Sequence, residues 1–475
     1  MKRQYLVVLI LAMSGLFFSC NKKTSTNVSA PNKVVGHSVA PGNISGAIEG
    51  TMTSGNTYVV VGNITVPKGD TLYIQNNVKV IVNGNFYIYV AGTLVSNGTQ
   101  NNQVWITYNG SPNPSTGMSH ADNVNENDTA DPALKGWWQG IICDTSCHML
   151  ALHWTHLEFC GKPTTTALGS IASGATDYAI YYGNPNGFLI IEDCWIYGTA
   201  DDAVRMQGGR IWIARNTLEK AGNSNGGDGF NAKGVTTGDM CYNLCVGNAT
   251  NSTKASDKGA PTGATTECNI NMYNNTYVDC GFRNTTAGKG ANIDYEQSAE
   301  GMAYNNLMID CHVGLRILTS PAADTNHCYY GNQFYYVDDT ALADNIYPVP
   351  GPSATHPELT DIPLYTTYLP VNFHYGYSYY NAPGIVGKNN PNFVNFPLPN
   401  SNFINTDFAE GFDFHLQSNS PCIGKGYTAF SALATSASPK IPVDAVNGFG
   451  ATQINPPGAD NGAYQSNGTG NQQTH

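Results

Sequence analysis

The chain has 475 residues, and Asp, Glu, Lys and Arg make up only 12% of it, against about 25% in an ordinary soluble domain. This shortage of charge, together with 51 glycines and 25 prolines, argues against helical bundles and coiled coils, whose exposed faces need Lys and Glu. The formal net charge is −12, and no basic cluster lies beyond the targeting segment described next. We therefore expect no nucleic-acid partner.

The first twenty residues predict a targeting segment. Lys2-Arg3 precede an apolar run over residues 5–18, which is too short to span a bilayer as a helix of a mature protein. The segment Leu16-Phe17-Phe18-Ser19-Cys20 resembles the lipobox of bacterial lipoproteins. The resemblance implies lipidation of Cys20 and a place in the cell envelope, as an outer-membrane lipoprotein that is periplasmic or surface-exposed. The alternative is an ordinary secreted protein with a free Cys20. In the lipoprotein interpretation, residues 21–45 form a flexible tether.

A repeated phrase runs through the middle of the chain. An Asn or Asp is followed by alternating apolar residues, a turn containing Gly or Asp, and another short alternating run. The gaps between these anchors run from 23 to 32 residues, which is the range for coils of a solenoid. Strand repeats of this length bury their apolar face only by stacking on one another. The anchors are Asp193, Asn216, Asn243, Asn275, Asn306 and Asn332.

These repeats resemble the right-handed parallel β-helix, the pectin-lyase-like fold, over residues 46–345. The phrase at 63–74 is similar to the opening coils of β-helix lipoproteins of the Bacteroidota, and 413–426 is similar to the segment that closes them. The fold expected is an all-β, right-handed parallel solenoid. We expect an irregular long loop over 346–390, then a closing segment and tail over 391–475.

Eleven of the twelve cysteines lie beyond the targeting segment. Cys160, Cys280 and Cys311 each follow a Thr or Asn by five residues, which predicts a ladder of buried free thiols at equivalent positions of the repeat. Two further pairs have a spacing that fits either a disulfide or a metal site: Cys143/Cys147 and Cys241/Cys245.

Polar residues are predicted to line one outer face of the solenoid. Alternate residues of a strand point outward, and the same register repeats on the next coil. The inward residues of this alignment are Val204, Phe230, Ile293 and Leu315. The outward residues are Arg205, Asn231, Asp294 and Arg316, followed by Gln207, Lys233 and Glu296. Such a face predicts a groove that binds an extended polysaccharide.

The residue types on this face suit β-elimination on a uronic-acid polymer. A base removes the proton beside the carboxylate, and a cation neutralises the developing enolate. We assign Lys233, Arg205 and Asn231 to catalysis, with Lys233 as the base once its pKa is lowered. The assignment of the remaining residues is Arg316, Asp294, Glu296 and Gln207 to substrate binding and Asp228, Asp201 and Asp202 to calcium.

Residues 227–233, Gly-Asp-Gly-Phe-Asn-Ala-Lys, are similar to the Asp-Gly-Phe-x-x-Lys segment of family 9 polysaccharide lyases. In that family the Asp of the segment helps to bind calcium, and the catalytic Lys comes from a later coil. The resemblance therefore implies a calcium-dependent lyase with Asp228 as a ligand. The chain departs from the family at 248–253, where a second calcium segment is replaced by Asn-Ala-Thr-Asn-Ser-Thr.

Two other interpretations remain open. Asp-Gly and Asp-Asp pairs are ordinary turn residues, and outward Arg and Asp often pair as a solvated face. The solenoid would then be a non-catalytic rod, either an adhesin or an accessory subunit of an outer-membrane protein complex. Asp201 and Asp202 also fit the adjacent carboxylates of pectin-type glycoside hydrolases, although the Gly-His-Gly and Arg-Ile-Lys segments of that family are absent.

Overall fold

The computed structural model describes residues 34–109, 132–168, 171, 173–174, 178–223, 226–284, 289–318, 322–339, 342, 346, 386–399 and 411–474. Cys20, residues 21–33 of the expected tether and most of the expected 346–390 loop lie outside this part of the chain. The first strand begins at Gly42, so the solenoid starts before residue 46. No helix of the described part is both long enough and apolar enough to cross a membrane.

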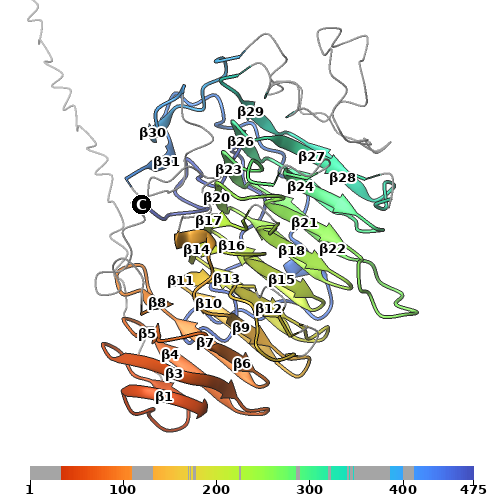
Figure 1. Cartoon of the computed structure of the whole chain (residues 1–475). Helices are drawn as coiled ribbons and strands as arrows, with labels where there is room; N and C mark the ends of the chain where they lie inside the picture. The colour runs from red at the N-terminus through yellow and green to blue at the C-terminus, as the bar shows by residue number, and fades with distance from the viewer. Residues whose placement is uncertain are drawn as a thin grey trace, which may run out of the picture. The chain divides into compact units, whose positions relative to one another are not determined.

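Each full coil of the solenoid contributes one strand to each of three parallel ladders (Figure 1). Ladder 1 is a sheet of ten strands: β2 (Gly50–Met52), β4 (Thr71–Gln75), β7 (Thr93–Asn97), β10 (Met149–His153), β13 (Phe188–Glu192), β16 (Arg210–Ala214), β19 (Thr237–Cys241), β22 (Asn269–Tyr273), β25 (Gly301–Tyr304) and β28 (Cys328–Gly331).

Ladders 2 and 3 together form the sheet of 19 strands. Ladder 2 contains β5 (Lys79–Val82), β8 (Val104–Tyr108), β11 (Thr155–Cys160), β14 (Trp195–Thr199), β17 (Thr217–Ala221), β20 (Leu244–Val246), β23 (Thr276–Val278), β26 (Leu307–Ile309) and β29 (Phe334–Tyr336). Ladder 3 contains β6 (Tyr87–Val90), β9 (Gly140–Cys143), β12 (Ile180–Tyr182), β15 (Val204–Gln207), β18 (Phe230–Lys233), β21 (Thr253–Ser256), β24 (Ala291–Glu296) and β27 (Val313–Ile317). The long β3 (Thr57–Val66) joins the ladders because it pairs with both β5 and β6, and β1 (Gly42–Ala47) pairs with β3.

The stacking of these strands confirms the parallel β-helix. The expected inward residues Val204, Phe230, Ile293 and Leu315 are buried and lie in one stack. The alignment missed one coil, however, because Thr253 of β21 lies between Phe230 and Ile293 in the register. A threonine at an inward position hid this strand from a search for alternating apolar residues.

A ladder of side-chain amides fixes the corner between ladders 1 and 2. Asn216 donates to the amide oxygen of Asn243 at 3.0 Å, and the same contact repeats along the stack. The anchors Asn216, Asn243, Asn275 and Asn306 are thereby confirmed as equivalent. The two other predicted anchors, Asp193 and Asn332, each precede the ladder position by one residue. Cys194 and Gln333 occupy that position. The residue before each ladder position has positive φ, as the tight corner requires: Asp193, Arg215, Tyr242, Asn274, Asn305 and Asn332.

All eleven cysteines of the described part are buried and free. Cys280 and Cys311 stack directly on adjacent coils, since Val278 pairs with Ile309 two residues earlier. Cys160 lies at the equivalent position of an earlier coil, but it stacks on Thr199 instead. The predicted free thiols are confirmed, whereas the ladder of three is interrupted. The pairs Cys143/Cys147 and Cys241/Cys245 form no disulfide.

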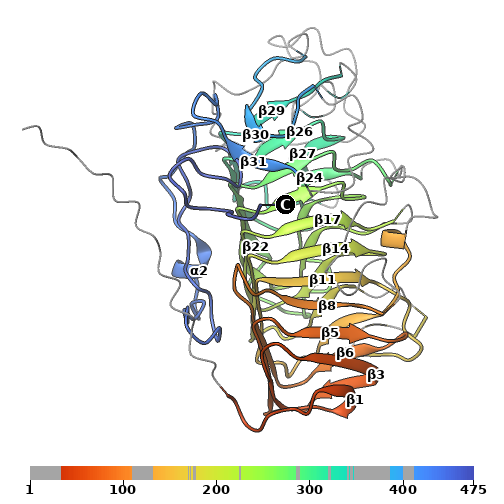
Figure 2. The same ribbon diagram turned by 90° about the vertical axis from the view of Figure 1, so that its left-hand side faces the viewer.

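Residues 411–474, which we call the C-terminal strap, run alongside ladder 1 (Figure 2). Near the last coils the amide of Asn332 donates to the carbonyl oxygen of Lys425 at 3.1 Å, and farther back His153 contacts the carbonyl oxygen of Gly448 at 3.2 Å. The expected closing segment therefore covers a flank of the solenoid, where it spans many coils. The remaining elements are η1 (Pro132–Leu134), the antiparallel pair β30 (Phe393–Asn395) and β31 (Asp413–Leu416), and α2 (Leu433–Ser436) in the strap.

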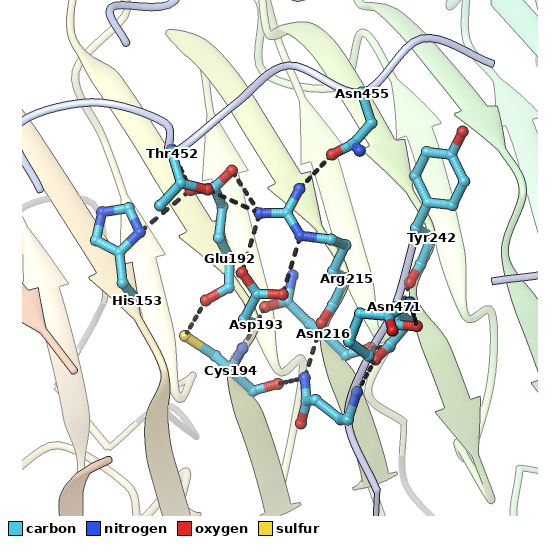
Figure 3. Close-up of polar contacts among 12 residues, drawn as sticks. His153, Glu192, Asp193, Cys194, Arg215, Asn216, Tyr242, Thr452, Asn455 and Asn471 are labelled. Carbon is cyan, nitrogen blue, oxygen red and sulfur yellow. Dashed lines mark hydrogen bonds and ion pairs between the residues drawn. The ribbon is translucent and has the colours of Figure 1, made fainter. Parts of the chain in front are cut away.

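A buried charge network fastens the strap to the solenoid (Figure 3). The guanidinium of Arg215 donates to Glu192 at 2.8 Å and to Asp193 at 2.9 Å. The same group reaches the strap, where it bonds the hydroxyl of Thr452 at 3.1 Å and the side-chain oxygen of Asn455. Every charge here has a partner of opposite sign, so the network holds the strap in place.

Candidate functional site

A polar pocket of about 320 Å³ opens on the outer face of ladder 3. Its wall is built by β15, β18, β21 and β24, which follow one another in the stack (Figure 1), by the turns that precede them and by the turn after β21. These turns come from Gly- and Asp-rich segments, which place carboxylates at the strand starts. The wall contains seven of the residues predicted from sequence: Asp201, Asp202, Arg205, Asp228, Asn231, Lys233 and Glu296.

The other predicted substrate-binding residues do not line the pocket. Asp294 is fully buried and pairs with Arg316 at 3.0 Å and with Lys254 at 3.5 Å. The amide of Gln207 donates to the backbone of the turn that begins at Lys258. Asp294 and Arg316 thus lie beside the pocket, in the same row as Lys254 on the next two strands, and Gln207 holds a turn at its rim.

Lys233 is the residue that most distinguishes this pocket. Its side chain is 6% exposed, and no carboxylate or hydrogen-bond acceptor of the described residues contacts its amine. Burial, together with the charges of Arg205 and Lys254, lowers the pKa of Lys233 to about 8. The neutral form of this amine, which becomes common as the pH approaches 8, can accept a proton.

Lys254 is a central pocket residue that sequence reasoning missed. Its amine lies 3.0 Å from Glu296, 3.5 Å from Asp294 and 3.8 Å from Asp228. Burial alone would lower the pKa of Lys254, but these three carboxylates raise it above its ordinary value. Lys254 therefore stays charged. No apolar alternation marks its strand in the sequence, and only the register of β21 places Lys254, which pairs with Asn231 on the neighbouring strand.

Arg205 and Asn231 are held by the carboxylates of the preceding turns. Arg205 donates to Asp202 at 2.5 Å, and its guanidinium lies 4.6 Å from the centre of the Tyr178 ring. The amide nitrogen of Asn231 donates to Asp202 and to Asp228, both at 2.8 Å. The amide oxygen of Asn231 is buried and has no hydrogen-bond partner among the described residues.

The predicted calcium ligands do not fit a calcium ion. Calcium takes six to eight oxygen ligands, whereas Asp202 faces Arg205, and Asp228 accepts bonds from Thr250 at 2.6 Å and from Asn251 at 2.9 Å. Burial alone would raise the pKa of Asp228, but Lys254 and Thr250 lower it to about 2. The oxygens of both carboxylates are thus directed at donors of the protein.

Asp201, the third expected calcium ligand, differs from its neighbours. Burial, together with the charge of Asp202, raises the pKa of Asp201 to about 7. One carboxylate of this kind cannot supply a calcium shell. Within the described ranges, the one close group of metal-type ligands lies elsewhere, at the turns before β25 and β28: Glu300, Asp324 and His327.

The strand registers define the chain as a parallel β-helix protein, and its outer face carries a polar pocket lined by both basic and acidic side chains. No protein-family model, no curated protein and no solved structure matches the chain. The function is therefore argued from the pocket itself.

Proposed function

We propose that the protein binds an acidic polysaccharide in the pocket of ladder 3 and that Lys233 acts there as the base of a β-elimination. The observation that carries this proposal is Lys233, a residue that is 6% exposed and whose amine lines the polar pocket with no hydrogen bond or ion pair to any described residue. Leaving a buried polar group unpaired costs free energy. A protein retains such a group where a ligand completes its contacts.

The pocket's residues supply binding and proton transfer. The neutral amine of Lys233 takes the proton beside the uronate carboxylate, and the electron pair of that C–H bond forms a carbon–carbon double bond. The bond to the neighbouring glycosidic oxygen breaks, and this oxygen takes a proton from water. The amide oxygen of Asn231 accepts a bond from a sugar hydroxyl and orients the ring. The products are a shortened chain and an unsaturated uronate.

Incubation with pectate, alginate or a glycosaminoglycan tests the activity through the ultraviolet absorbance of the unsaturated uronate. Lys233→Met should lower the rate roughly 10²- to 10⁴-fold, as loss of a positioned general base does. The matched control is Lys440→Met, which removes an exposed lysine of the strap and should leave the rate unchanged. A Lys233→Met protein with normal turnover would contradict this role.

Binding without cleavage has its own support. Arg205 and Lys254 are already neutralised by carboxylates, which is the pattern of a rigid docking face. If the wild-type chain binds a polyuronate but cleaves none, the pocket is a binding site only. If it binds no glycan, the solenoid fits better as an accessory subunit of an outer-membrane protein complex.

We also propose that Cys20 carries a lipid that anchors the protein in the cell envelope. The support is the segment Leu16–Cys20 at the end of the apolar run. Growth with labelled palmitate should tag the wild-type chain, and Cys20→Ala should lose both the label and membrane retention. Retention of the unlabelled variant would show that a partner holds the protein at the membrane.

A further inference from the structure

Lys258 stands apart from the other cations of the pocket. Arg205 pairs with Asp202, and Lys254 lies among three carboxylates. The charge of Lys289 acts on Asp228 and Glu296, whose pKa values it helps to lower. Lys258 is exposed, lines the same pocket and forms no ion pair with any residue that the structure describes.

The turn that carries Lys258 is firmly held. The amide of Gln207 donates to the carbonyl oxygens of both Lys258 and Gly259 at 3.1 Å. The backbone N–H of Lys258 donates to the hydroxyl of Ser256 at 3.2 Å. Gly259 has a φ of +82°, and a Cβ atom there would lie 2.7 Å from the amide nitrogen of Gln207. The backbone of Lys258 is therefore fixed at the pocket rim, while its side chain keeps its charge available.

We infer that Lys258 binds the carboxylate of the acidic sugar in place of a calcium ion, and that Gln207 is the positioning residue that holds Lys258 at the pocket. This inference rests on the proposed function and names the recognition element of that same site. Elimination increases the negative charge on the substrate carboxylate as the enolate forms, so a cation beside that carboxylate stabilises the transition state. The carboxylates of Asp202 and Asp228 accept hydrogen bonds from donors of the protein and so do not hold a calcium ion. The positive charge beside the substrate carboxylate must then come from a basic side chain.

The test measures binding of a galacturonate trimer by calorimetry, in a Lys233→Met background that prevents turnover, once with a chelator and once without it. Lys258→Met should weaken binding at least tenfold, whereas Lys258→Arg should stay within about threefold, because one well-placed ion pair is worth about a factor of ten. Gln207→Ala should weaken binding by an intermediate factor. A neutral galactose trimer should bind all four proteins equally, which separates loss of charge recognition from loss of structure.

Three results would overturn the inference. Equal affinity of the Lys258→Met and parent proteins for the acidic trimer would remove Lys258 from recognition. Loss of binding on chelation would restore a metal ion to the site. A Gln207→Ala protein that loses the acidic and the neutral trimer alike would reduce Gln207 to a structural role. If the parent protein binds no uronate at all, the proposed function itself fails, and the inference falls with it.

Discussion

Two buried cations on different faces of the solenoid have opposite surroundings. Arg215, beside the strap, is 3% exposed and donates to Glu192, Asp193 and two strap residues (Figure 3). Lys233, in the pocket of ladder 3, is 6% exposed and has no partner among the described residues. A buried charge with a full set of partners organises structure, whereas one without partners is a candidate for binding a ligand.

One carboxylate from each site, Glu192 beside Arg215 and Asp201 in the pocket, shows a difference of the same kind. Burial alone would raise the pKa of Glu192, but His153 and Arg215 lower it to about 2. In the pocket, burial and the charge of Asp202 raise the pKa of Asp201 to about 7. Glu192 therefore stays ionised near neutral pH, although burial raises the pKa of Asp193 beside it, whereas Asp201 and Lys233 of the pocket exchange protons near neutral pH.

The largest expected effect on the free energy of unfolding comes from removing the charge of Arg215 from its network. Arg215→Met should destabilise the protein by about 3–5 kcal/mol, because it leaves the carboxylates of Glu192 and Asp193 buried without their counter-charge. Chemical unfolding followed by circular dichroism measures the change. The matched control is Arg210→Met, since Arg210 is less buried and contacts the strap through one bond to the Ser438 carbonyl at 2.7 Å. A loss from Arg215→Met no larger than that of the control would contradict the network's role.

Removing the charge of Lys233 should change the free energy of unfolding in the opposite direction. Lys233→Met should stabilise the protein by up to about 3 kcal/mol at pH 7, because the folded pKa of about 8 lies below the ordinary value of 10.5 and each pKa unit is worth about 1.4 kcal/mol. The folded state binds this proton more weakly than the unfolded state, so the penalty is complete below pH 8 and fades as the pH rises toward 10.5. Unfolding of both proteins at pH 7 and pH 10 measures it. A variant less stable than the wild type at pH 7 would show that Lys233 has a structural partner.

Local spacing made the pocket partly predictable. The register of Arg205, Asn231 and Lys233 follows from alternation within a strand and equal register between coils, and both are confirmed. Lys254 could not be placed, because the inward Thr253 of its strand is polar and bonds the backbone oxygen of Asn292 at 2.8 Å. A strand whose inward residue is satisfied by a hydrogen bond lacks the apolar signal on which the alignment depended.

Local sequence patterns could not predict contacts between residues that lie far apart in the chain. Arg215 bonds Asn455 of the strap across 240 residues, and no local pattern links them. The calcium assignment failed for a related reason. The sequence shows a carboxylate but not the hydrogen-bond donors around it, and these donors decide whether its oxygens are free to bind a metal ion. Thr250 and Asn251, which satisfy Asp228, lie in the segment 248–253 that the sequence showed only as a departure from a calcium motif.

The smallest effect concerns a buried acid of ladder 1, Asp239 of β19, which contacts the strap and has no cationic partner among the described residues. Asp239 is fully buried and accepts the backbone N–H groups of Leu433 at 3.0 Å and Ala434 at 2.7 Å, at the start of α2. Burial raises the pKa of Asp239 to about 7, although these two N–H groups lower it in part. The folded state therefore binds the proton more tightly than the unfolded state, whose pKa is near 3.8.

Stability should consequently rise as the pH falls from 8 to 5.5, and Asp239 should contribute about 2 kcal/mol of that rise. Asp239→Asn, which carries no titrating proton, should lose this contribution and be closest to the wild type at the acidic end. Unfolding midpoints at pH 8, 7 and 5.5 measure the difference, and Asp413→Asn, at a half-buried position of the strap, is the control. If the unfolding midpoints of Asp239→Asn and the wild type change with pH in parallel, the two N–H groups keep the carboxylate of Asp239 ionised. Asp239 would then be compensated at α2 as Glu192 is by Arg215.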